Sequence, residues 1–214
     1  MIAVIADIVG SRKLADREGA QREIENAIAR AQRTLPVADR MLAATVGDEL
    51  QGVYLALGDA LASLLLVQLE LPEPISCRFG IGIGSVRAVP SGEGEIPEGP
   101  GWWAAREAID LVHSKQQRTA PTARTWIVAA PEEDGRMHDA VRLANAYLLA
   151  RDQLVGTMSE RTRRLVAGRC ARLTQRELAE REGITQSAVS QALTTAGAAA
   201  VVEGFHALGA GVPR

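Results

Sequence analysis

Cysteine and histidine are scarce in this sequence. Two cysteines, Cys77 and Cys170, and three histidines occur among its 214 residues. The histidines have no metal-ligand spacing with one another or with a cysteine, so a zinc site is not predicted. The two cysteines fall in what we interpret as separate domains. We therefore expect free thiols in a reducing cytosol rather than a disulfide.

Long hydrophobic runs are also missing. The apolar stretch at residues 61–71 is much shorter than the ~20 residues that a membrane-spanning helix needs. No basic segment or small-residue cleavage site precedes the first strand-like run, which argues against a signal peptide. We therefore expect a cytoplasmic protein with no membrane partner.

Charge is divided unevenly along the chain. The formal net charge is −2, but residues 1–150 carry 15 basic and 20 acidic side chains, whereas residues 151–214 carry 9 and 6. An acidic larger part joined to a basic smaller part fits a protein that contacts DNA through the smaller part only. The basic excess is concentrated in five arginines: Arg161, Arg163, Arg164, Arg169 and Arg172.

The hydrophobic pattern predicts an α+β fold in two domains. The first six elements run βαββαβ, the split βαβ order that gives a ferredoxin-like sheet. We place the domain boundary after residue 156, which gives a sheet domain at 1–156 and an all-α domain at 157–214. The expected elements are strand 2–7, helix 18–35, strands 41–46 and 49–57, helix 59–71, strand 75–84, a loop at 91–101, helix 102–117, strand 125–130 and helix 138–155.

Two acidic residues stand at the ends of strand patterns. Asp7 closes the first strand, and Asp48 lies in the Gly-Asp turn of the hairpin. The first strand is central in the βαββαβ order and pairs with the hairpin, so both carboxylates are expected to meet at one sheet edge. Such a pair suits Mg²⁺ or Mn²⁺ with a polyphosphate. A more ordinary interpretation is also open, with Asp7 as a helix cap and Asp48 as a turn residue.

Three neighbouring features also allow two interpretations. Glu49 is expected on the strand face opposite the turn carboxylate, where it is only solvated. The glycines of the 80–84 run lie within a strand, so they favour close packing of a helix or partner chain over a phosphate loop. Trp102 and Trp103 either stack on a base or divide between core and interface, and the second arrangement is the commoner.

Four segments resemble the catalytic domain of class III nucleotide cyclases and, more loosely, diguanylate cyclases and palm-type polymerases. The resemblance implies metal binding by Asp7 and Asp48, and catalysis by these two residues with Arg106. It also implies that the backbone after the first strand holds a triphosphate. The matching segments are Asp7 with Ile8, Val9, Gly10, Ser11 and Arg12; Gly47 with Asp48; the strand Arg78–Gly84; and Ala104-Ala105-Arg106.

The sequence departs from the cyclase pattern at two places. Trp102 stands where cyclases have an asparagine, and the apolar residues 42–44 stand where they carry a purine-reading lysine. Base-reading groups and part of the transition-state apparatus are therefore missing. Losing two such groups would cost orders of magnitude in rate, so ligand sensing is an alternative to catalysis.

Longer motifs resemble the SatD family of bacterial proteins. They are Asp-Ile-x-Gly-Ser-Arg at 7–12, Gly-Asp-Glu-x-Gln-Gly at 47–52 and Gly-Pro-Gly-Trp-Trp-x-Ala-Arg-Glu-Ala at 99–108. The match extends over nearly the whole chain. It implies an architecture, a cyclase-like domain with a helix-turn-helix tail, more than a function.

Residues 173–193 show the pattern of a helix-turn-helix. Thr174 and Glu177 form a capping box, Gly183 supplies a left-handed turn residue, and Thr185 caps the second helix. A small helical packing module is the alternative. The residues expected to contact DNA are Thr185, Gln186, Ser187, Ser190 and Gln191, which present amide and hydroxyl groups to base edges, with Arg163 and Arg164 nearby.

These features predict a DNA-binding transcriptional regulator. Its cyclase-like domain would sense a nucleoside triphosphate or cyclic nucleotide, with or without a divalent metal. A homodimer is expected, because cyclase-like sites form across a dimer and paired heads suit a palindromic operator. The alternative is an enzyme, a metal-dependent nucleotidyl cyclase or oligonucleotide synthase that uses Asp7 and Asp48. A third interpretation has both domains serving only as protein-interaction surfaces.

Overall fold

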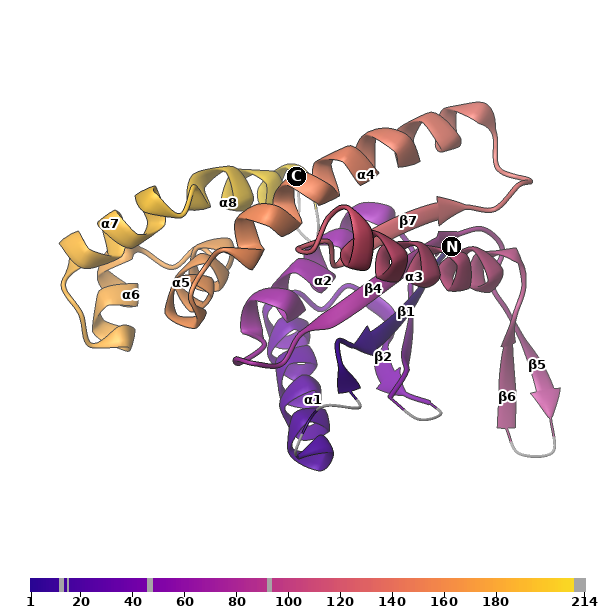
Figure 1. Ribbon diagram of the computed structural model, residues 1–214, viewed down its shortest axis with the longest axis horizontal. Helices are drawn as coiled ribbons and strands as arrows, with labels where there is room; N and C mark the ends of the chain where they lie inside the picture. Colours follow the sequence, from indigo (N-terminus) through magenta and orange to yellow (C-terminus); the bar gives the residue numbers. More distant parts are fainter. Residues whose placement is uncertain (12–13, 15, 46–47, 92–93, 210–214) are drawn as a thin grey trace.

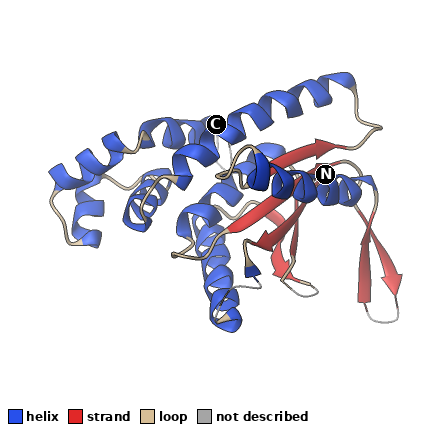
Figure 2. Ribbon diagram, in the orientation of Figure 1, coloured by secondary structure: helices blue, strands red, loops and turns tan. Residues whose placement is uncertain are grey.

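A computed structural model describes residues 1–11, 14, 16–45, 48–91 and 94–209. A mixed sheet with helices on both faces forms one part of the molecule, and four further helices extend from one end of it (Figures 1 and 2). The α+β class predicted from the sequence is confirmed. Within the described residues, no helix combines the length and apolar character needed to cross a membrane.

The main sheet has five strands in the order β2-β3-β1-β4-β7. β1 is central and pairs antiparallel with β3 and β4, and β7 adds a parallel strand beside β4. The central position of β1 brings its end beside the β2–β3 hairpin, as the sequence predicted. The strand bounds are β1 Ile2–Ile8, β2 Ala38–Ala44, β3 Leu50–Tyr54, β4 Cys77–Ile83 and β7 Thr125–Ala129.

The alternating residues of β1 divide between two apolar clusters. Val4 and Ala6 belong to a cluster with α1 (Arg17–Thr34) and α2 (Leu57–Glu70) on one face of the sheet. Ile5 belongs to a second cluster with α3 (Pro100–Arg118) on the other face. Because both faces are covered, residues 2–6 of β1 are all apolar, as expected for a buried strand, and Asp7 follows only near its end.

Helix α3 packs very closely on β4. A Cβ atom on Gly82 would overlap the carbonyl oxygen of Gly101 and the backbone nitrogen of Ala105, and one on Gly84 would lie 2.8 Å from the nitrogen of Gly101. These glycines let the helix backbone approach the strand, which confirms the packing interpretation of the 80–84 run.

A two-stranded hairpin replaces the loop predicted at 91–101. β5 (Arg87–Ser91) and β6 (Gly94–Glu98) pair antiparallel and extend away from the sheet (Figure 1). The Gly/Pro/Glu composition is typical of a loop, so the sequence prediction was wrong here. A ribbon of two strands tolerates proline because half of its N–H groups face outward and form no ladder bond.

Helix α4 (Gly135–Gly156) covers the backbone at the β7 edge of the sheet. The amide of Asn145 accepts from the N–H of Ile127 at 2.9 Å and donates to its carbonyl at 2.8 Å. Asp152, which is fully buried and paired with Arg151, accepts from the N–H of Thr125 at 2.8 Å. Side chains of α4 thus take the place of a neighbouring strand.

The C-terminal helices share a core with the sheet region. One continuous apolar cluster includes Leu65 of α2, Leu165 of α5, Val189 of α7 and Phe205 of α8. The division into domains at residue 156 stays a prediction, although α4 does end at that residue. The helix bounds are α5 Glu160–Cys170, α6 Gln175–Glu182, α7 Gln186–Thr195 and α8 Ala198–Ala207.

Candidate functional site

Asp7 at the end of β1 forms a two-pronged ion pair with Arg78 of β4. The pair lies directly across the antiparallel ladder, with Arg78 Nε 2.8 Å from Asp7 Oδ1 and Nη2 2.8 Å from Oδ2. Arg78 also donates from Nη1 to Gln116 Oε1 of α3 at 2.8 Å and is only 7% exposed. Asp7 therefore faces α3, and a buried guanidinium fixes its orientation.

A second ion pair lies in the same cleft. Arg106 of α3 contacts both carboxylate oxygens of Glu49, at 2.8 and 2.7 Å, and Gln51 donates to Glu49 at 2.9 Å. Glu49 was expected to be only solvated, and this prediction was wrong. The residue lies just before β3 begins, where regular strand alternation does not apply, so its side chain is free to turn toward α3.

The two ion pairs line one open cleft of about 630 Å³. Its floor is the end of β1, one wall is α3, and the opposite rim is the tip of the β2–β3 hairpin. Asp48 lies on this rim, so the structure brings together the three residues predicted for catalysis, Asp7, Asp48 and Arg106. The volume is in the range of small-ligand sites.

The four residues that follow Asp7 also line the cleft. The N–H of Val9 donates to the carbonyl of Ser76 at 2.8 Å, so this amide already has a protein partner and is removed from the predicted phosphate contacts. Gly10 has φ +68°, a left-handed conformation that suits glycine. The predicted contacts Arg12 and Gly47 lie outside the described residues.

The carboxylates offer a partial fit to a divalent metal. Each oxygen of Asp7 accepts one bond from Arg78, and a carboxylate has about four acceptor sites, so two remain for a cation. Asp48 would supply the second carboxylate. Among the described residues no group of three or more His, Cys, Asp or Glu side chains is placed to hold a metal. A cation here would therefore take most of its ligands from a bound polyphosphate or from water.

Helix α3 contributes residues that the sequence analysis missed. His113, Gln116 and Gln117 line the cleft, and Gln117 Nε2 lies 2.6 Å from His113 Nε2. The helical spacing from Arg106 to His113 places both on one face, which was the available signal. Trp102 is buried in the core, as the commoner interpretation predicted for one of the two tryptophans, and Trp103 is 63% exposed, so an interface at Trp103 stays a prediction.

The α6–α7 unit (residues 174–195) has the local geometry predicted for it. The capping box of Thr174 and Glu177 is present, and Gly183 has φ 64° at the end of α6. Thr185 caps α7, accepting from the N–H of Ala188 at 3.2 Å. The turn is therefore fixed at both ends by side-chain and backbone bonds.

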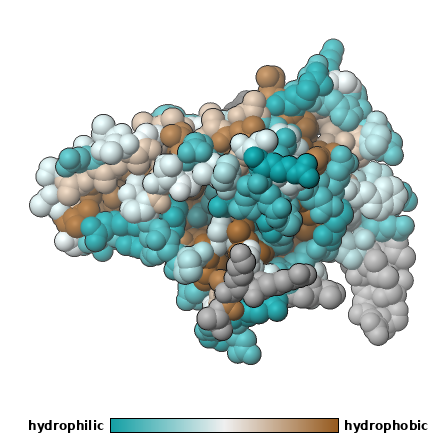
Figure 3. Space-filling view, in the orientation of Figure 1, coloured by the Kyte–Doolittle hydropathy of each residue, from teal (hydrophilic) through white to brown (hydrophobic). Residues whose placement is uncertain are grey.

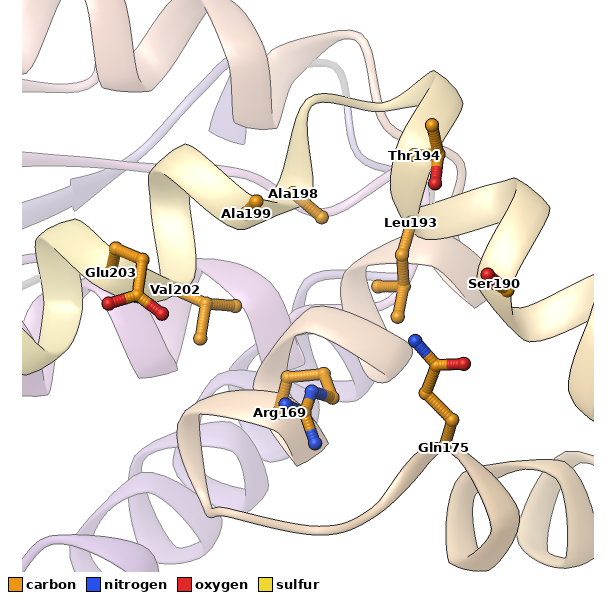
Figure 4. Close-up of a pocket in the computed structure, with 9 residues that line it drawn as sticks. All are labelled: Arg169, Gln175, Ser190, Leu193, Thr194, Ala198, Ala199, Val202 and Glu203. Atoms are coloured by element: carbon orange, nitrogen blue, oxygen red, sulfur yellow. The ribbon is translucent and has the colours of Figure 1, made fainter.

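One side of α7 is exposed and carries no charge. Pale colours, between hydrophilic and hydrophobic, are common on the upper side of this end of the molecule in Figure 3, with hydrophilic areas beside and below them. Ser190 and Thr194 of α7, with Arg169 and Gln175, line a hollow of about 210 Å³ between α7 and the helices around it (Figure 4). The exposed residues of α7 include the predicted set Gln186, Ser187, Ser190 and Gln191, with Thr185 at its cap.

The two arginines predicted to contact DNA have partners within the protein. Arg163 donates to the carbonyls of Leu71 at 3.2 Å and Met158 at 3.1 Å, and its side chain is only 13% exposed. Arg164 binds both oxygens of Glu182 at 3.0 and 2.7 Å, a hydrogen-bonded pair that raises the pKa of Arg164 and lowers that of Glu182. Arg163 therefore links α5 to the end of α2, and we remove it from the predicted DNA contacts.

Both cysteines are free and buried, as expected. Burial raises the pKa of the Cys77 and Cys170 thiols to about 12 in each case. Neither thiol is therefore a candidate nucleophile near neutral pH.

The model of the SatD family matches residues 1–202. The chain belongs to the SatD family. No curated protein matches it. Two solved structures of a bacterial light-regulated adenylyl cyclase are similar to this SatD-family chain, at 14% and 11% identity and TM-scores of 0.44 and 0.39. Each similarity covers 58% of the chain, and 72% and 41% of the respective cyclase chains.

In this SatD-family chain, the three family motifs quoted above meet at one place. The segment from Asp7, the segment through Asp48 and Glu49, and the helix that carries Arg106 all line the same cleft. Residues from all three motifs therefore face one cleft.

Proposed function

We propose that the protein is a DNA-binding regulator whose cleft binds a phosphate-bearing, nucleotide-like ligand. The observation that carries the DNA half is the α6–α7 unit. Its two helices are joined by a left-handed glycine and a capped start, and these local features support a helix-turn-helix. The exposed amide and hydroxyl groups of α7 are suited to base edges in the major groove.

Phosphate contacts in this proposal come from arginines other than Arg163. Arg161, Arg172 and Arg181 are exposed and lie on or beside α5 and α6. Arg164 would contribute only if it left Glu182. In this arrangement the arginines would bind the phosphates and so position the protein on DNA, and the uncharged side chains of α7 would contact the bases.

The cleft supports the ligand half of the proposal. Arg106 is 52% exposed and bonds Glu49 through Nη2, so its other N–H groups can reach a phosphate. Ser11 lies at the open end of β1, and the carboxylates leave acceptor sites for Mg²⁺ or Mn²⁺. The order β2-β3-β1-β4 of the first four strands supports a ferredoxin-like, cyclase-like arrangement for this part. The proposal includes a homodimer, because a symmetric operator has two half-sites and each would bind one α6–α7 unit.

Selection from a random DNA library, followed by fluorescence anisotropy on the enriched sequence, tests the DNA half. The double variant Gln186→Ala/Gln191→Ala should weaken specific binding by roughly 10-fold or more, since each base contact is worth about 1–3 kcal/mol. Gln21→Ala on the distant helix α1 is the control and should bind as the wild type does. Failure to enrich any sequence at moderate salt would remove this half.

The second candidate is a metal-dependent nucleotidyl cyclase or oligonucleotide synthase. It is favoured by one observation, that Asp7, Asp48 and Arg106 line one cleft. Incubation with each nucleoside triphosphate and Mg²⁺ or Mn²⁺ should then release pyrophosphate, and Asp48→Asn should abolish the release. Silence with all four triphosphates would leave the sensor as the better proposal. Binding without turnover would appear as a rise in melting temperature.

A further inference from the structure

A chain of polar contacts joins the cleft to the turn of the α6–α7 unit. Its middle is the segment between α2 and β4, residues 71–76, which we name the connector. The connector is anchored to the cleft strand β1 at one end and to α5 at the other.

The cleft end of the chain is held by two contacts between β1 and the start of β4. Asp7 pairs with Arg78, and the N–H of Val9 donates to the carbonyl of Ser76 at 2.8 Å. Ser76 Oγ also accepts from Arg124 Nε at 2.8 Å. A ligand that displaces the Val9 segment acts on the connector through Ser76, and one that displaces Asp7 acts on Arg78, two residues beyond Ser76.

The other end of the connector is bound by α5. The N–H of Glu73 donates to Glu160 Oε2 at 3.0 Å, and Arg163 Nη2 donates to the carbonyl of Leu71 at 3.2 Å. Arg163 Nη1 also lies 3.5 Å from a carboxylate oxygen of Glu73. These contacts attach the first turn of α5 to a segment about 90 residues earlier in the chain.

The chain continues from α5 to the end of α6. Glu160 binds the connector through Oε2 and Arg164 through Oε1, at 2.7 Å to Nη1. Arg164 in turn binds both oxygens of Glu182, the last residue of α6, directly before Gly183 of the turn. The single carboxylate of Glu160 thus joins the connector to the arginine that holds α6.

We propose that occupancy of the cleft is transmitted through the connector, Glu160 and Arg164 to the α6–α7 unit, so that the cleft ligand regulates DNA affinity. This inference rests on the proposed function for its DNA readout, but the internal coupling is measurable without DNA. Arg163 and Glu160 are positioning residues in this scheme, since neither touches ligand or DNA. Coupling between sites typically changes affinity by about 5- to 150-fold, and we expect a value near 10-fold.

Hydrogen exchange measured by mass spectrometry on the full chain tests the coupling. Asp7→Asn serves as the perturbation, because it breaks the pair with Arg78 without any knowledge of the ligand. We expect faster exchange in residues 160–182 as well as around the cleft. In a Glu160→Ala background, adding Asp7→Asn should change exchange in α6 by less than half as much. Glu180→Ala is the matched control: within the described part of the chain Glu180 pairs only with Arg176 of the same helix, so this variant should leave the response intact.

Exchange changes confined to the strands around Asp7 would overturn the inference. Should Asp7→Asn fail to fold, Asp7→Asn/Arg78→Gln removes both charges and gives the same test. On the DNA selected above, the perturbing variant should shift the dissociation constant about 10-fold, and Glu160→Ala should abolish that shift. Coupled exchange without any DNA binding would sink the proposed function and leave the coupling standing. Normal DNA binding without coupled exchange would do the reverse.

Discussion

The cleft and the exposed face of α7 differ in the charge of their side chains. The cleft holds two carboxylate–guanidinium pairs, one of them with a largely buried arginine, whereas the described face of α7 presents only amides, hydroxyls and small apolar groups. Buried charges fix their partners tightly, because an unpaired partner is costly. Neutral donors and acceptors are exchanged with water at little cost. The cleft therefore suits a small charged ligand, and the face of α7 suits the base edges of DNA.

The largest expected effect comes from disturbing the close packing of α3 on β4, which supports one wall of the cleft. Gly82→Ala places a Cβ atom against the backbone of α3 and should lower the free energy of unfolding by at least about 3 kcal/mol, because backbone cannot move aside as a side chain can. Urea denaturation gives the value. Gly135→Ala, whose Cβ would meet nothing within 4 Å, is the control and should be neutral or slightly stabilising.

Breaking the charged pair gives the next largest effect. Asp7→Asn should cost about 2–3 kcal/mol, somewhat less than the ~3–5 kcal/mol of a fully buried pair, because the Asp7 side chain is 28% exposed. Thermal and chemical unfolding both report it. Asp139→Asn removes an exposed pair with Arg142 on α4 and should change stability by less than about 0.5 kcal/mol. Equal losses in the two variants would contradict the contrast between buried and exposed charge.

Removing the cap of α7 should have a smaller effect and spare the cleft. Thr185→Ala deletes the bond to the N–H of Ala188, and we expect a loss of about 1 kcal/mol. Exchange in the first turn of α7 should quicken much more than that of β1, because Thr185 is not among the contacts that join the cleft to α6. Thr185→Ser keeps the hydroxyl and should recover most of the loss. An effect on β1 of similar size would mean that the cap of α7 is itself part of the coupling.

The smallest effect is a pH dependence in the helical region. Hydrogen bonding to Arg164 lowers the pKa of Glu182, so the pair contributes stability above the ordinary glutamate pKa of about 4.3 and loses it as the pH falls through the lowered value. Glu182→Gln should cost about 0.2–1 kcal/mol at neutral pH, because Arg164 is substantially exposed. The difference between variant and wild type should shrink toward zero in acid. A difference that stays constant with pH would exclude the ion pair as its cause.

The sequence predicted the fold well where the signal is local. Apolar periodicity located the strand that carries Asp7, and the caps at Thr174 and Thr185 are confirmed because each depends on residues within one turn. It also predicted that Asp7 and Asp48 would lie at one edge. The hairpin β5–β6 was missed because its composition is that of a loop.

Contacts between distant segments were not predictable from the sequence. Arg78 pairs with Asp7 because β1 and β4 adopt one antiparallel register, and a shift of a single residue would put the two side chains on opposite faces. Arg163 was predicted to contact DNA from local charge, but its partner Leu71 is distant in sequence. Such partners follow from how α5 packs against the end of α2, which only the assembled structure reveals.

The cover that α4 provides over β7 has a consequence for assembly. Asn145 and Asp152 bond to the N–H groups of Thr125 and Ile127 and to the carbonyl of Ile127, so these groups of the β7 edge are closed to another strand. The opposite edge is β2, a largely exposed strand that pairs only with β3 among the described residues. Two copies can pair through their β2 edges, and the paired sheet then has no free β2 edge for a third copy. Growth of the main sheet by strand addition at β2 would therefore stop at a pair.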